Sequence, residues 1–211
     1  MKKKILVACL CAALAVLTIA GTTLAYLTSK DTVTNTFTVG NVSIKLDEAK
    51  VDEMGKIDTT TNERVKANSY KLIPGHTYAK DPMVTVLKGS EKSYIKMTVT
   101  FSMAKELDAI FAPTGADMTS IFNGYDSTNW IYKDNTKDTV ANTRTYEFWY
   151  KEAVAAPTAD VELDALFDSI TVPGTITNAQ LATIKDMTIT VNAYAIQADG
   201  FTNAADAWAK F

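Results

Sequence analysis

The stretch that decides the fold is residues 94–103, which read Tyr-Ile-Lys-Met-Thr-Val-Thr-Phe-Ser-Met. Apolar and polar residues alternate along it with a period of two, which indicates a β-strand. One face carries an unbroken apolar row formed by Ile95, Met97, Val99, Phe101 and Met103. Such alternation is typical of an antiparallel sheet with one buried face and one wet face. We therefore expect a sheet at the centre of the fold.

Similar patterns recur on both sides of this stretch and extend the prediction to an all-β fold. The other strand candidates are residues 32–39, 42–46, 83–87, 130–132, 143–151 and 185–197. Turns or loops are expected at residues 49–69, 72–75, 88–90 and 133–138. Short helices are expected at residues 104–111, 161–167 and 178–184, the last with Asn178 as its N-cap, and a helical turn at residues 203–211. Many short strands with few helical insertions predict a single β-sandwich or jelly-roll-like domain.

The composition excludes several function classes. The chain has 211 residues, with 21 basic and 24 acidic side chains, and its pI is near 5.2, which argues against a nucleic-acid partner. There is one histidine, His76, and there are two cysteines, Cys9 and Cys11. A zinc motif built from several His or Cys ligands cannot be assembled from this set.

The N-terminus has the three parts of a secretory signal peptide. Three lysines at residues 2–4 precede an apolar run over residues 5–20, and small side chains follow at Thr23 and Ala25. Cleavage after Ala25 leaves a mature domain of residues 26–211 that begins at Tyr26 and has no cysteine. We therefore expect a secreted protein, located in the extracellular matrix or at the cell surface, that meets the membrane only through its signal peptide.

Two other interpretations of the N-terminus were weighed against cleavage after Ala25. A permanent membrane anchor would need about 20 apolar residues, whereas the run over residues 5–20 has 16. A lipoprotein box ending at Cys9 would leave four apolar residues after the lysines, fewer than the roughly 7–15 of a signal peptide.

The mature N-terminus resembles a known family. Residues 24–46 read LAYLTSKDTVTNTFTVGNVSIKL and are similar to the start of the TasA/camelysin family of Gram-positive bacteria. The matching residues are Ala25, Tyr26, Asn35, Thr36, Phe37, Gly40 and Leu46. Residues 72–101 and 188–201 are similar to two further blocks of that family. The resemblance implies processing by a SipW-type signal peptidase and an extracellular β-sandwich subunit of a biofilm-matrix fibre.

The resemblance also implies that the N-terminal segment of one subunit completes the sheet of the next. Residues 26–39 are rich in Thr, lack Pro and alternate, so they are suited to pair with a sheet edge. We identify them as a possible donor strand, with Asn35, Phe37 and Val39 as its assembly residues. Pairing within the same chain, as an ordinary edge strand, is the other interpretation. The expected partners in fibre assembly are copies of this chain or related subunits.

Camelysin-like members are described as metalloproteases, so the resemblance also raises an enzymatic alternative. A zinc protease of the His-Glu-x-x-His type needs two histidines one helical turn apart, and this chain has only His76, in an expected turn. A Ser-His-Asp triad would also depend on His76. We therefore expect no enzymatic activity and no cofactor. A monomeric cell-surface adhesin is the main alternative to a fibre subunit.

Two further groups of residues were considered as ligand sites. Asp134, Asn135 and Asp138 offer loop oxygens to a weakly bound Ca²⁺, but a plain polar turn is the favoured interpretation. The aromatic cluster Tyr146, Phe148, Trp149 and Tyr150 resembles a sugar-binding platform. However, Tyr146, Phe148 and Tyr150 share one strand face, which favours a core or interface row.

Overall fold

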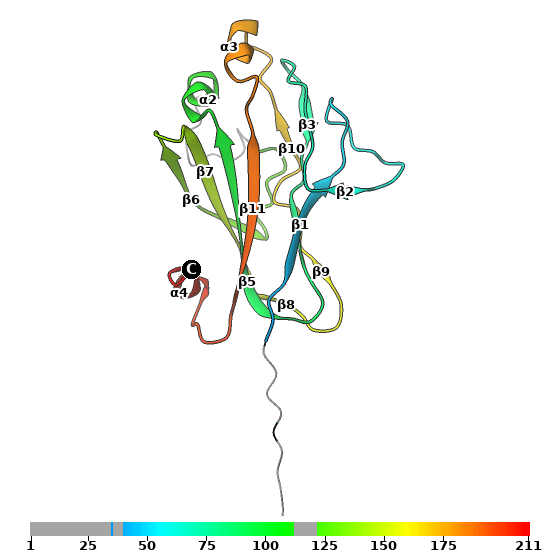
Figure 1. Ribbon diagram of the computed structural model, residues 1–211, viewed down its shortest axis with the longest axis vertical. Helices are drawn as coiled ribbons and strands as arrows, with labels where there is room; N and C mark the ends of the chain where they lie inside the picture. The colour runs from blue at the N-terminus through cyan, green and yellow to red at the C-terminus, as the bar shows by residue number, and fades with distance from the viewer. Residues whose placement is uncertain (1–34, 36–39, 112–121) are drawn as a thin grey trace, which may run out of the picture. The chain divides into compact units, whose positions relative to one another are not determined.

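The structure is a computed structural model that describes residue 35, residues 40–111 and residues 122–211 (Figure 1). The chain divides into two units, Met1–Thr38 and Val39–Phe211. The fold described below is that of the second unit.

The described residues form antiparallel sheets with a few short helices, so the predicted all-β class is confirmed. The strands are β1 (Ile44–Ala49), β2 (Arg64–Val65), β3 (Thr77–Ala79), β4 (Met83–Val86), β5 (Ser90–Ser102), β6 (Trp130–Asp138), β7 (Thr143–Tyr150), β8 (Val154–Ala156), β9 (Val161–Glu162), β10 (Ser169–Thr171) and β11 (Ile189–Gln197). The helices are α2 (Ala104–Phe111), α3 (Asn178–Thr183) and α4 (Ala204–Trp208).

The strands are arranged as a sandwich. One layer is a sheet with the order β11-β5-β7-β6, to which β8 is added beside β5. The other layer contains a sheet with the order β2-β1-β4-β9 and the pair β10-β3. Figure 1 shows β6, β7, β5 and β11 on one side of the molecule and β1, β3, β9 and β10 on the other.

The apolar row of residues 94–103 lies at the centre of the core. Ile95, Met97 and Val99 are fully buried, and they face the fully buried Val84 and Val86 within the same core cluster. Burying each such side chain contributes about 1.5–3 kcal/mol to folding. The alternation of this strand is therefore the main sequence determinant of the sandwich.

The aromatic cluster is divided between the two faces of β7. Tyr146 and Phe148 are buried in the core, as the core interpretation predicted, and burial raises the pKa of Tyr146 to about 12. Trp149 lies on the outer face, where its ring is 6.3 Å from that of Trp208 in α4. Lys133 Nζ is 4.3 Å from the Trp149 ring centroid, in cation–π contact.

The turn predicted at residues 133–138 is wrong. These residues belong to β6, which continues to Asp138 and pairs with β7. The chain reverses at residues 139–142, where Asn142 takes a positive φ of 51° and Asp138 Oδ1 accepts the backbone N–H groups of Val140 and Ala141. The segment is polar because β6 is an exposed edge strand, and exposed edges carry the charges that turns also carry.

The helix predicted at residues 161–167 is also wrong. The segment begins as β9 and continues without regular structure along β4: the Leu163 N–H donates to Val84 O and the Leu166 N–H to Pro82 O. Leu163, Leu166 and Phe167 are buried, so the apolar spacing reflected core contacts rather than a helix.

The other helix predictions are confirmed, with one correction. Helix α2 has the predicted bounds, and α4 lies inside the predicted terminal segment. The N-cap of helix α3 is Thr177 rather than the predicted Asn178, which is the first residue of the helix. Thr177 forms a capping box with Gln180, and this reciprocal pair of hydrogen bonds outweighs the general preference for Asn at this position.

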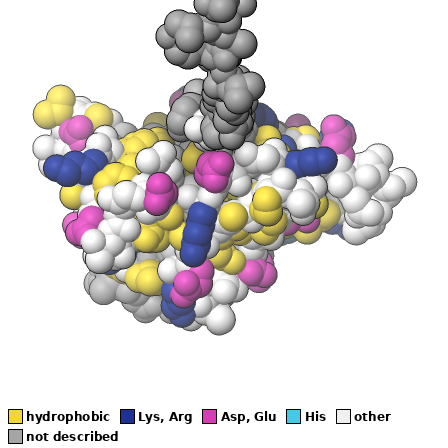
Figure 2. Space-filling view, turned by 90° about the horizontal axis from the view of Figure 1, so that it is seen from below, with side chains coloured by type: hydrophobic (Ala, Val, Ile, Leu, Met, Phe, Trp, Pro, Cys, Tyr) yellow, Lys and Arg dark blue, Asp and Glu magenta, His cyan; other side chains and the backbone are white. Residues whose placement is uncertain are grey.

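The end of the molecule shown in Figure 2 carries charges of both signs. Lys and Arg side chains lie beside Asp and Glu side chains, with hydrophobic side chains between them. The mixture agrees with the small formal net charge of −3. This face offers no extended field of one sign that would attract a polyelectrolyte.

Candidate functional site

The two edges of the larger sheet are different. The β6 edge carries Lys133, Asp134, Lys137 and Asp138, and its pairing with β7 shifts register between Tyr132 and Asp134. Edge charges and β-bulges are the means by which proteins prevent further strands from adding to a sheet. The β6 edge is therefore protected.

The β11 edge has neither feature. From Met187 to Gln197 the chain has no charged residue, and β11 pairs with β5 along its whole length without a register shift. Among the described residues, no strand pairs with its other side. An uncharged, regular edge of nine residues leaves alternate backbone N–H and C=O groups free to pair with an added strand.

The core-facing row of β11 is incompletely covered. Ile189, Val191, Ala193 and Ala195 pack against the core but remain partly exposed. The corresponding row of β5 is fully buried at Ile95, Met97 and Val99. One more strand beside β11 would cover this apolar row.

A groove runs beside the first half of β11, between this strand and β1. The two strands lie side by side (Figure 1), and the groove has a volume of about 660 Å³. On the β1 side the edge is also incompletely paired, because β2 pairs only with Glu48 and Ala49 whereas β4 pairs with residues 44–47. The lining residues are Leu46, Asp47, Glu48, residues 65–70, Leu72, Lys80, Pro82, Lys185 and residues 187–191.

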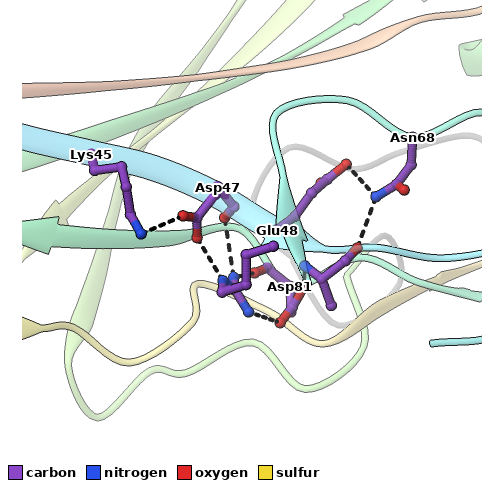
Figure 3. A network of polar contacts seen from close by, with 7 residues as sticks. Lys45, Asp47, Glu48, Asn68 and Asp81 are labelled. Atoms are coloured by element: carbon purple, nitrogen blue, oxygen red, sulfur yellow. Dashed lines mark hydrogen bonds and ion pairs between the residues drawn. The ribbon is translucent and has the colours of Figure 1, made fainter. Parts of the chain in front are cut away.

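A network of charged side chains supports the β1 wall of this groove (Figure 3). Arg64 Nε donates to Asp47 Oδ1 at 2.5 Å, and Arg64 Nη1 donates to Asp81 Oδ2 at 2.8 Å. Arg64 Nη2 donates to the backbone carbonyls of Asp47 and Asp81. Lys45 Nζ approaches Asp47 Oδ2 at 2.9 Å. The guanidinium group of Arg64 therefore links β2 to β1 and to the residues that precede β4.

The network determines the ionisation of Asp47, which is 6% exposed. Burial alone would raise the pKa of this carboxyl. The hydrogen bonds and charges of Lys45 and Arg64 outweigh burial and hold the pKa below its usual value. Asp47 therefore stays a carboxylate at neutral pH and keeps its partners in place.

A second polar cluster adjoins the first. Lys80 Nζ donates to Glu48 Oε2 at 2.5 Å, and Asn68 Nδ2 donates to Glu48 Oε1 at 3.0 Å. Lys80 and Glu48 are both buried, each 7% exposed. The sequence did not reveal this cluster, because charged residues are expected at the surface unless they are paired.

Most of the residues proposed from the sequence for export and assembly lie outside the described part of the chain. These are Thr23, Ala25, Tyr26, Phe37 and Val39. Asn35 is described; it is exposed and lies outside the helices and strands. The donor strand therefore remains a prediction from the sequence, whereas the edge strand β11 lies within the described residues.

His76 does not fit a catalytic zinc site. Its Nε2 atom lies 2.6 Å from the backbone carbonyl oxygen of Met54, and its ring packs on Tyr78. Within residues 40–111 and 122–211, no three His, Cys, Asp or Glu side chains gather as a metal site would require.

The three residues that carry the Ca²⁺ candidate oxygens, Asp134, Asn135 and Asp138, all lie on β6 rather than in a loop. Asp134 Oδ1 accepts the Asn135 N–H, while Asp138 Oδ1 accepts backbone N–H groups of the turn. Asn135 Oδ1 accepts from Arg144 Nη1. These hydrogen bonds direct the oxygens to different protein donors. The plain polar turn favoured from the sequence is wrong, because the segment is a strand.

One family comparison bears on this chain. The family described as camelysin metallo-endopeptidase matches residues 1–72. The match confirms the resemblance to the TasA/camelysin family for residues 1–72. The camelysin match includes the predicted donor strand, residues 26–39, and the strands β1 and β2 at the groove, but it ends before β11. No curated protein and no solved structure matches the chain.

Among the residues that the structure describes, no helix is long and apolar enough to cross a membrane. The predicted signal peptide, residues 1–25, lies outside the described residues.

Proposed function

We propose that this chain is a secreted structural subunit of an extracellular biofilm-matrix fibre. Residues 26–39 of one copy pair with the β11 edge of the next copy, which is the same chain or a related subunit. The observation that carries the proposal is the contrast between the two edges of one sheet, charged and bulged at β6 and uncharged and regular at β11.

Strand addition at β11 combines two kinds of contact. Backbone hydrogen bonds along the edge supply affinity for any extended segment. Alternate side chains supply specificity, because they point into the gap between the two layers. In residues 26–39 the apolar candidates for this position are Phe37 and Val39, and the partly exposed Ile189 and Val191 are the surfaces that they would cover.

Export precedes assembly in this proposal. A SipW-type signal peptidase cleaves after Ala25, so that Tyr26 becomes the first residue and the donor strand becomes the free end of the chain. The family match over residues 1–72 supports this part of the proposal, since it includes both the signal peptide and the donor strand. The protein then acts outside the cell and has no enzymatic activity.

The edge contrast is tested by one substitution and its matched control. Thr190 in β11 and Thr136 in β6 are both exposed, and each lies opposite a threonine of the adjacent strand, Thr100 or Thr145. Lysine on an edge disfavours strand addition. We expect Thr190→Lys to abolish fibres in electron micrographs and Thr136→Lys to leave them unchanged, while circular dichroism shows both proteins folded.

The same experiment separates the alternatives. Equal fibre formation by the two folded variants would overturn the assignment of β11 as the acceptor edge. A wild-type protein that stays monomeric under all assembly conditions would overturn the fibre function and favour the monomeric adhesin.

A further inference from the structure

Two side chains, Lys80 and Asn68, donate hydrogen bonds to the carboxylate of Glu48 at the β1 wall of the groove. Glu48 Oε2 accepts from Lys80 Nζ at 2.5 Å, and Glu48 Oε1 accepts from Asn68 Nδ2 at 3.0 Å. Glu48 therefore bridges an amine and a side-chain amide. These are the two groups from which a new amide bond can be made.

The Lys80–Glu48 pair is buried. Each residue is 7% exposed, and Glu48 is the one hydrogen-bond partner of Lys80 Nζ among the described residues. Holding two charges out of water carries a large desolvation penalty. Passing one proton from the ammonium to the carboxylate removes both charges and produces a neutral amine, which is the nucleophilic form of lysine.

The amide of Asn68 is held in one orientation by the backbone of the chain leaving β1. Asn68 Nδ2 donates to Ala49 O at 2.9 Å, and Asn68 Oδ1 accepts the Val51 N–H at 3.1 Å. Because one backbone group is an acceptor and the other is a donor, a flipped amide would lose both hydrogen bonds. The nitrogen of the amide therefore faces Glu48, and its oxygen faces a backbone N–H.

We propose that Lys80 and Asn68 join in an intramolecular amide bond, with Glu48 as the proton relay. Lys80 Nζ attacks Asn68 Cγ, and the negative charge that develops on Oδ1 is stabilised by the Val51 N–H. The bond between Cγ and Nζ forms, and the bond between Cγ and Nδ2 breaks. The two protons that Nζ loses pass through Glu48 to Nδ2, which departs as ammonium. Glu48 ends as the carboxylate, and no group is oxidised or reduced.

The position of Glu48 suits this relay, because its two oxygens contact the attacking and the leaving nitrogen. The attack itself requires Nζ to reach about 3–3.5 Å from Cγ, which rotation about the Lys80 side-chain bonds has to supply. Tyr70 also adjoins the cluster: burial and the Glu48 carboxylate both raise the pKa of its phenol. Tyr70 therefore stays neutral and adds no competing charge.

The product would be a covalent cross-link between the loop after β2 and the residue that follows β3. It would close a ring from residue 68 to residue 80 beside the groove, in a mature chain that has no cysteine for disulfides. The inference does not depend on the fibre function, since the reaction uses side chains of one copy only.

The bond is detected by tryptic digestion of the purified protein and tandem mass spectrometry. Trypsin releases residues 67–71 with Asn68 and residues 72–80 with Lys80 as separate peptides if the bond is absent. With the bond, cleavage after Lys80 is blocked. We then expect residues 67–71 joined to residues 72–88, at the summed masses of these two peptides less one ammonia for the new bond.

Substitutions test the role of each of the three residues in forming the bond. Lys80→Arg and Asn68→Ala should abolish the joined peptide, and Glu48→Gln should reduce its yield at least tenfold while it keeps the size of the side chain. Glu63→Gln is the matched control, because Glu63 pairs with Lys50 at the exposed surface and should leave the yield unchanged.

Two results would overturn the proposal. The first is a wild-type protein whose two peptides stay separate after prolonged incubation, whether Asn68 is intact or converted to Asp. The second is a folded Glu48→Gln variant that forms the bond as completely as the wild type. The wild-type digest is decisive on the bond itself even where a variant fails to fold.

Discussion

At the scale of single residues, the buried ion pairs at the β1 wall of the groove contribute to the stability of the fold. Arg64 bridges Asp47 and Asp81, and Asp47 is almost fully buried. Removing one partner of a buried ion pair leaves the other charge without compensation and costs about 3–5 kcal/mol. We expect Arg64→Met to lower the free energy of unfolding by roughly 3 kcal/mol in urea denaturation, near the lower end because Arg64 is itself partly exposed.

The exposed pair Lys50–Glu63 supplies the control for this measurement. Its two side chains are 47% and 50% exposed, and surface pairs contribute about 0–1 kcal/mol. Lys50→Met should therefore leave the urea midpoint of unfolding close to that of the wild type. If Arg64→Met and Lys50→Met both leave stability to urea nearly unchanged, Arg64 does not stabilise the β1 wall of the groove.

The lowered pKa of Asp47 gives the fold an acid-sensitive component. The carboxyl binds its proton less tightly in the folded chain than in the unfolded chain, whose value is near 3.9. Its contribution to stability is therefore fully present above the unfolded pKa and is lost as the pH falls through the lower folded pKa. We expect Asp47→Asn to flatten the fall in stability that the wild type shows below about pH 5. Parallel pH curves for the two proteins would contradict this assignment.

His76 gives a prediction about activity. The one histidine of the chain lies on the Met54 carbonyl and the Tyr78 ring, and a zinc protease of the His-Glu-x-x-His type needs two histidines on one helix. We expect purified protein to cleave casein no faster than a buffer control, with or without a chelator. Chelator-sensitive cleavage that disappears in His76→Ala would show that the chain is a protease.

At the scale of elements, the sequence predicted strands by their alternation and failed where other forces produced the same pattern. Residues 94–103 and 185–197 alternate, and β5 and β11 lie there. Residues 161–167 have helical spacing of apolar residues, yet hydrogen bonds to β4 hold them in an extended path. The alternation of apolar and polar residues also does not distinguish an edge strand from a central strand of a sheet. The open side of β11 became visible only in the sheet order.

The buried cluster Glu48, Asn68 and Lys80 could not be predicted for a similar reason. Each residue type is common at the surface, and the three are spread over residues 48–80. Only the folded chain brings the two nitrogens to one carboxylate. The sequence resemblance included Lys80 but gave no reason for its burial.

The donor strand allows a test that compares its two faces. Phe37 and Thr38 are adjacent, so in an extended strand their side chains point to opposite sides. Phe37→Asp removes an apolar anchor worth about 1.5–3 kcal/mol at every junction between subunits, whereas Thr38→Asp places the same charge on the other side. We expect electron microscopy to show short or no fibres for Phe37→Asp and long fibres for Thr38→Asp. Equal effects would mean that Phe37 is not inserted into a neighbouring subunit.

At the scale of the whole molecule, the described strands of the sandwich all follow the N-terminal segment in the sequence. All described strands lie between Ile44 and Gln197, and Val39–Phe211 forms one of the two units of the chain. A protein that begins at Gly40 should therefore fold, with the circular dichroism of a β-rich protein, but it lacks the donor strand. We expect it to remain monomeric in sedimentation and to form no fibres.

A synthetic peptide of residues 26–39 supplies the missing donor strand to the truncated protein as a separate molecule. The truncated protein has an open β11 edge and no strand to fill it, so it should bind the peptide with one-to-one stoichiometry, and Thr190→Lys should weaken that binding at least tenfold. Thr136→Lys should not. Fibres formed by the truncated protein would refute donation, because no donor strand would be present to join the subunits. A truncated protein that is unfolded alone and folds when the peptide is added would show that residues 26–39 belong to their own sandwich, as an edge strand within one chain.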